Sequence, residues 1–93
     1  MMSVNTTLFR LDAGDLGRSL AEAHATAEQQ EDGSELLLDF SAVRRLDTAA
    51  VRTLHRVSVT ATARRVKLTA RAVQVDVYKV LKLAGLAERI SFM

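Results

Sequence analysis

Residues 35–54 read ELLLDFSAVRRLDTAAVRTL, joining an apolar run to an acidic, hydroxyl-bearing turn and then to an amphipathic pattern. The run Leu36–Phe40 has the continuous apolar character of a buried strand that is covered on both faces. Asp47 and Thr48 are residue types that cap a helix by accepting hydrogen bonds from its free N–H groups. The same N–H groups favour an anion such as a phosphate. The stretch therefore predicts an α/β domain and marks the turn where function is most visible.

The composition indicates one soluble domain. The chain has 93 residues, 48% of them hydrophobic and 26% charged, which is enough apolar surface for a single core. We expect one domain over residues 1–93 without a linker, with a flexible start at residues 1–6. No run approaches the roughly 18 apolar residues of a membrane span, the start lacks a signal-peptide pattern, and cysteine is absent. We therefore expect a cytoplasmic protein with no direct membrane insertion.

Charge is divided unevenly along the chain. Residues 1–47 carry nine acids against four bases, whereas residues 48–93 carry nine bases against two acids. The basic half is compatible with a face that binds nucleic acid or an acidic partner, and equally with solvated helix faces attracted to the acidic half. The four aromatic residues are not interleaved with the arginines as a stacking platform, so no nucleic-acid partner is expected.

Hydrophobic periodicity predicts the elements of the first half. Leu8–Leu11 is a short strand candidate. After Gly14, with Asp15 as the helix N-cap, apolar residues recur at helical spacing until the polar segment 29–33 closes the helix.

Two later segments show both helical and strand-like periodicity. Segment 50–63 carries a helical stripe, but its β-branched residues alternate near residue 57 and lean towards a strand. Segment 73–84 also alternates at its start, whereas its length and the stop at Gly85 favour a helix. The remaining strand candidates are segments 66–69 and 90–92. Strand and helix then alternate, which predicts parallel pairing with right-handed crossovers.

Three segments together resemble the STAS domain family, the module of anti-sigma factor antagonists and sulfate transporter tails. They are LLLDFSAVRRLDTAA at 36–50, VKLT at 66–69 and VLKLAGL at 80–86. The family pattern is a strand ending Asp-hydrophobic-Ser, an Asp-Ser-Ser-Gly-like turn, a helix, a strand and a closing helix ending Leu-x-Gly-Leu. The resemblance spans residues 6–93 and implies helices for both ambiguous segments. It implies a single STAS-like α/β domain, with a mostly parallel four-stranded sheet and about three helices.

This resemblance implies a bacterial signalling module that binds and does not catalyse. Typical antagonists place the turn and the following helix against an ATP-dependent anti-sigma kinase, which phosphorylates a serine at the helix start. Carried over to this chain, Asp47 matches the motif aspartate, Thr48 the first hydroxyl position, Ala49 the usual phosphoacceptor and Ala50 the glycine. Ala49 cannot accept a phosphate, so the usual switch is absent unless Thr48 takes its place.

The Asp-Thr turn also resembles the small STAS subunit of the ABC transporter that moves phospholipids between bacterial membranes. There the helix docks beneath the ATPase subunit. The alternative function is therefore an accessory subunit docking on a transporter ATPase, and a stress-signalling scaffold or a nucleic-acid-binding domain ranks lower. The expected partner is a protein, either an anti-sigma factor of the kinase-like ATPase type or a transporter ATPase. Homodimer formation stays open.

The predicted contact surface continues from the turn onto the following helix. Arg52, His55 and Arg56 share one exposed side through their i, i+3 and i+4 spacing. They form either the basic part of a docking surface or an ordinary solvated face. The predicted partner-binding residues are Asp47, Thr48, Ala49, Arg52, His55 and Arg56.

No catalytic residue, cofactor or metal site is predicted. Ser41 and Thr48 lie close to Asp47 in sequence, yet no histidine is placed to activate either hydroxyl. Asp39 and Ser41 form either a turn or part of a phosphate pocket with Thr48. Neither histidine has a second imidazole or a carboxylate at metal-ligand spacing.

Overall fold

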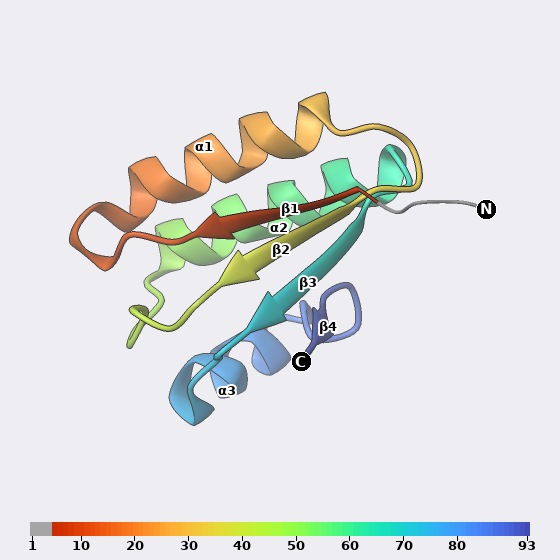
Figure 1. Ribbon diagram of the computed structural model, residues 1–93. Helices are drawn as coiled ribbons and strands as arrows, with labels where there is room; N and C mark the ends of the chain where they lie inside the picture. The colour runs from red at the N-terminus through yellow and green to blue at the C-terminus, as the bar shows by residue number, and fades with distance from the viewer. Residues whose placement is uncertain (1–4) are drawn as a thin grey trace.

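The computed structural model describes residues 5–93, which form one four-stranded sheet and three α-helices (Figure 1). The strands are β1 (Thr6–Arg10), β2 (Glu35–Asp39), β3 (Lys67–Arg71) and β4 (Ser91–Phe92). The helices are α1 (Leu16–Gln29), α2 (Thr48–Ala63) and α3 (Val75–Leu83), and a short 3-10 turn η1 (Ala13–Asp15) leads into α1. Strand and helix alternate as predicted, and both ambiguous segments are helical, as the family resemblance implied.

All four strands are parallel, and their order in the sheet is their order in the chain. The register pairs Thr6 with Glu35, Glu35 with Lys67, and Thr69 with Ser91. Each crossover therefore steps to the next strand in the same direction. Because such crossovers are right-handed, α1, α2 and α3 all lie on one face of the sheet.

No helix of residues 5–93 covers the opposite face of the sheet, hereafter the open face, so the prediction that Leu36–Phe40 is covered on both faces is wrong. Leu36 and Leu38 are buried under the helices. Leu37 points the other way and is only half-buried, beside Leu8, which is 48% exposed. Parallel sheets usually carry helices on both faces. Here the sequential strand order brings no helix of the described residues across the second face.

Polar side chains tie the strands together on this open face. The Thr69 hydroxyl of β3 donates to the carboxylate of Glu35 in β2 at 2.7 Å, two residues before Leu37, with which Thr69 pairs. The Arg71 guanidinium donates to the buried Asp39 carboxylate at 3.2 Å, and Arg10 Nε lies 3.8 Å from the same oxygen. These contacts bridge β1, β2 and β3 where no helix packs.

Side-chain capping sets the predicted helix starts. The Asp15 carboxylate accepts a hydrogen bond from the Arg18 N–H at 3.3 Å, which confirms Asp15 as the N-cap of α1.

Leu11, predicted as the end of a strand, follows β1 and is buried in the core. Of the start predicted to be flexible, residues 1–4 lie outside the described residues, and Thr6 already belongs to β1. The strand limits thus shift by one or two residues while each element keeps its place.

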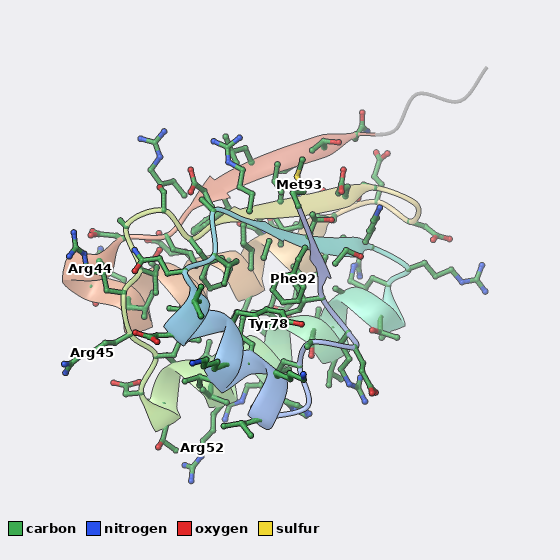
Figure 2. All side chains as sticks on the ribbon, turned by 90° about the horizontal axis from the view of Figure 1, so that it is seen from below. Arg44, Arg45, Arg52, Tyr78, Phe92 and Met93 are labelled. Carbon is green, nitrogen blue, oxygen red and sulfur yellow. The ribbon has the colours of Figure 1, made fainter. Side chains whose placement is uncertain are left out.

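The far edge of the sheet is held by an aromatic pair (Figure 2). Tyr78 of α3 meets Phe92 of β4 edge-to-face, with ring centroids 5.1 Å apart. Tyr78 remains 39% exposed, so the aromatic pair lies at the surface. The contact fixes the two-residue strand β4 against the helix that precedes it.

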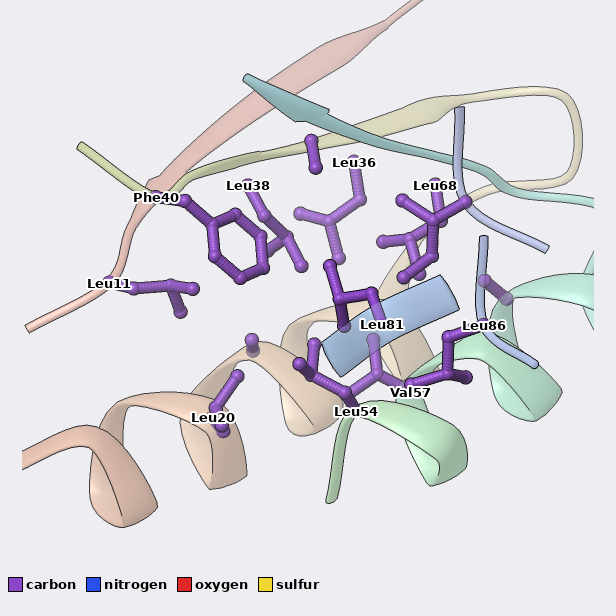
Figure 3. Close-up of a cluster of buried hydrophobic side chains, with 14 of the residues drawn as sticks. Leu11, Leu20, Leu36, Leu38, Phe40, Leu54, Val57, Leu68, Leu81 and Leu86 are labelled. Carbon is purple, nitrogen blue, oxygen red and sulfur yellow. The ribbon is translucent and has the colours of Figure 1, made fainter. Parts of the chain in front are cut away.

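One hydrophobic core lies between the sheet and the three helices (Figure 3). Its central side chains are Leu36, Leu38 and Leu68 from the sheet with Leu20 from α1, Leu54 and Val57 from α2, and Leu81 from α3. All of these are at most 3% exposed. Within the described residues, no helix is both long and apolar enough to cross a bilayer.

Candidate docking surface

The turn that begins α2 is built around Asp47. Its backbone is extended, its carboxylate accepts from the Ala50 N–H at 2.8 Å, and its carbonyl accepts from the Val51 N–H at 3.0 Å. The side chain is therefore committed to the helix start. Of the two roles expected for Asp47, the structure shows the cap directly.

Thr48 and Ala49 stand exposed on the first turn of α2, whereas the next residue, Ala50, is only 3% exposed. Ala50 anchors the turn in the core and holds its two neighbours outward. The Ala49 carbonyl accepts from the Thr53 hydroxyl at 3.1 Å, which adds a contact within the helix. The predicted motif positions 48 and 49 are thus displayed at the surface.

One side of the turn adjoins a shallow hollow between α2 and the end of α3. The hollow measures about 340 Å³ and is lined by Val51, Arg52, His55, Arg56, Ala84 and Leu86. Arg52, His55 and Arg56 are all exposed along its rim. The structure therefore brings the three basic residues of the predicted surface together, and adds apolar lining residues from the segment after α3, Ala84 and Leu86, that sequence spacing did not reveal.

A second hollow, about 450 Å³ in volume, lies between the connection from β2 to α2 and the start of α1. It is lined by Ala13, Leu16, Ala42, Val43, Arg44 and Arg45. Figure 2 shows Arg44 and Arg45 extending outward at the same end of the molecule as Arg52. Arg44 and Arg45 are not among the predicted partner-binding residues. The sequence feature that could have identified them is the pair of adjacent arginines just before the helix N-cap Asp47.

A family model described as "Mlab, STAS domain" matches residues 1–92. The chain belongs to the STAS domain family. No curated protein matches the chain. STAS domains are generally non-catalytic protein-interaction modules, so the family supports the coarse expectation of a regulatory binding module.

Elsewhere in this STAS domain, Asp39 and Ser41 act as turn formers. The Ser41 N–H donates to Asp39 Oδ1 at 2.8 Å, and this backbone hydrogen bond is the main reason why the pKa of Asp39 lies below its usual value. The Asp39 side chain is engaged on the open face of the sheet, whereas Thr48 begins a helix on the covered side. The structure does not join Asp39 to Thr48 in a phosphate pocket.

The two histidines of the STAS domain have different surroundings. His24 bridges α1 and α2, with Nε2 3.0 Å from the Thr60 hydroxyl and Nδ1 3.5 Å from the Glu28 carboxylate. The prediction that neither histidine has a carboxylate at ligand spacing is therefore wrong for His24, since Glu28 lies at i+4. His55 lies on the rim of the first hollow. Within residues 5–93, no three His, Cys, Asp or Glu side chains gather in a group able to hold a metal ion.

Proposed function

We propose that this STAS domain is a non-catalytic regulatory module that docks on a protein partner through the Asp47–Thr48 turn and the first half of α2. The observation that carries the proposal is the continuity of the surface. Exposed Thr48 and Ala49 adjoin the hollow rimmed by Arg52 and Arg56, and its apolar floor suits a packed contact. A cytoplasmic location is part of the proposal.

The chemistry at positions 48 and 49 decides how such docking is regulated. Ala49 is exposed but has no hydroxyl, so phosphorylation at the family's usual position does not occur on this chain. Thr48 is the exposed hydroxyl next to it. Neighbouring helix residues project about 100° apart, so a phosphate on Thr48 meets a different part of the partner. Any phosphorylation switch at the turn therefore runs through Thr48.

The first candidate function is anti-sigma factor antagonist-like, with a kinase-like anti-sigma ATPase as the partner. It follows from the family resemblance of the turn and helix, and it places the switch at Thr48. A phosphate of roughly −2 charge inside a packed contact is repelled and desolvated unless a cation pairs with it. In this function, phosphorylation of Thr48 weakens the complex.

The second candidate function is an accessory subunit that docks on the ATPase of a phospholipid-transporting ABC system. Ala49 favours it, because a permanent subunit needs no phosphoacceptor at the contact. Thr48 then supports assembly through its hydroxyl and methyl groups without being modified. Both candidates use the same surface and differ in the ATPase that they contact.

An affinity-capture experiment from native cytoplasm tests the proposal. The baits are wild type, Thr48→Glu, Arg52→Glu/Arg56→Glu and a control, Thr62→Glu, which carries the same change at the exposed far end of α2. We expect wild type and the control to capture one ATPase and the other two baits to lose it. Mass spectrometry identifies it as a kinase-like anti-sigma factor or a transporter ATPase. Equal capture by all four baits would show that the surface is wrongly assigned.

A further inference from the structure

We infer that the partner presents an acidic protein surface to this STAS domain. The arginines that line the two hollows beside the start of α2 bind this acidic surface. This inference rests on the proposed docking function and specifies the chemistry of its partner. The four arginines are Arg44 and Arg45 beside the first turn, and Arg52 and Arg56 along α2.

The segment around the start of α2 carries more bases than acids. Between residues 41 and 58, these four arginines face a single acid, Asp47. Helix α2 itself contains no Asp or Glu. The Asp47 carboxylate is directed at the Ala50 N–H, at 2.8 Å. The four arginines of this segment are exposed, and Figure 2 shows three of them, Arg44, Arg45 and Arg52, extending outward.

Arginines elsewhere in the described part of the chain have partners, with the exception of Arg89. Arg10 and Arg71 pair with Asp39, Arg18 with Glu22, Arg65 with Asp32, and Arg64 donates to the Gln30 carbonyl. The four arginines around the start of α2 make no side-chain hydrogen bond or ion pair within residues 5–93. Like charges at i and i+4, as in Arg52 and Arg56, destabilise a helix slightly. Folding therefore does not explain the cluster, whereas pairing with an acidic partner does.

The hollows favour a protein over a nucleic acid. Each combines an arginine rim with an apolar floor, formed by Leu16 and Val43 in one and by Val51 and Leu86 in the other. Apolar side chains of a protein fill such floors while its carboxylates form bidentate pairs with the guanidinium groups. No Phe, Tyr or Trp lines either hollow, and the one aromatic ring among the lining residues is that of His55.

The first experiment locates the contact in native cells. A photo-cross-linking amino acid replaces Ala49 in one variant and Leu8, on the open face of the sheet, in another. Sequencing of the cross-linked peptide then shows which segment of the partner lies against the turn. We expect a cross-link from position 49 to a segment in which acids outnumber bases. A neutral or basic segment would overturn the acidic-partner inference and leave the docking function intact. Partner capture from position 8 alone would overturn the docking function itself.

The second experiment measures the charge dependence with the purified partner. We compare wild type, Arg44→Glu/Arg45→Glu and a control with the same charge change, Lys67→Glu/Arg89→Glu. Lys67 is the first residue of β3 and Arg89 lies just before β4, at the other end of the strands. We expect the Arg44/Arg45 variant to bind at least about tenfold more weakly at low salt, and the difference to shrink at about 1 M salt, where the Debye length is about 3 Å.

Two results of this second experiment would contradict the inference. Equal weakening by the control variant would show that total charge, and not this surface, governs binding. Binding of a 20-base-pair duplex DNA more tightly than the partner, with loss in the Arg44→Glu/Arg45→Glu variant, would assign the arginines to nucleic acid. Circular dichroism of every variant establishes that loss of binding is not loss of fold.

Discussion

Replacing Asp47 with alanine separates its role in the fold from its role in docking. The carboxylate accepts from the Ala50 N–H at 2.8 Å, and Ala50 is 3% exposed, so the first turn of α2 cannot fray without opening the core. Loss of an N-cap of this kind costs about 1 kcal/mol, within a range of about 0.5–2 kcal/mol. For a domain of this size, about 1 kcal/mol lowers the Tm by about 4–8 °C. Urea unfolding followed by far-UV circular dichroism measures the change, with an unaltered m-value.

Two control variants make this prediction refutable. Asp47→Asn keeps an oxygen acceptor at the cap and removes only the charge, so we expect it to cost less than about 0.5 kcal/mol. Thr48→Ala removes an exposed side chain that makes no hydrogen bond within the described residues, and should stay within about 0.5 kcal/mol of wild type. If the asparagine variant loses as much stability as the alanine variant, the charge of Asp47 stabilises the turn, and the capping argument is wrong.

Other perturbations test the rest of the fold. Asp39→Asn should lose about 2 kcal/mol at neutral pH, since the carboxylate is buried and charge-paired. The hydrogen bond from the Ser41 N–H lowers the pKa of Asp39 in the folded protein. The ionised Asp39 therefore stabilises the fold above the unfolded pKa of about 4, and this stabilisation disappears as pH falls through the folded pKa. A stability difference between wild type and Asp39→Asn that persists unchanged in acid denaturation would refute this pH dependence. Ala72→Gly should stabilise by up to about 1 kcal/mol, because φ at Ala72 is 57°, whereas Ala25→Gly in exposed helix should destabilise by about 1 kcal/mol; thermal melts that move both variants in the same direction would argue against strain at Ala72. Leu81→Ala should cost about 2–5 kcal/mol in chemical denaturation, and a loss below about 1 kcal/mol would contradict its central place in the core.

Local signals in the sequence predicted the helix starts well. Asp15 and Asp47 act as caps through contacts within three residues, so no knowledge of the rest of the fold was needed. The helical state of segment 50–63 was different, because its valines alternate like those of a strand. In the structure Val57 is fully buried and Val59 is 44% exposed, on different sides of α2. Family resemblance, not periodicity, resolved that segment.

Features that depend on long-range packing could not be predicted. The apolar side chain of Leu37 suggested a second covered face, but strand order determines where crossover helices lie. The rim formed by Arg52 and Arg56 followed from helical spacing. The second hollow could not be predicted from helical spacing, because Leu16 of α1 lies far from Arg44 and Arg45 in the sequence and meets them only in the folded chain.

The sequential strand order also bears on how the chain folds. Every strand pairs only with the strand before or after it in the chain, so each crossover unit can complete itself before the next part of the chain is needed. Folding rates rise when contacting residues lie close in sequence, and this topology contains no pairing between the chain's first and last strands. The final unit is the weakest, because β4 adds only two paired positions, Thr69 with Ser91 and Ala70 with Phe92. This edge is therefore the last part of the sheet to form and the first to open, at the end of the molecule away from β1.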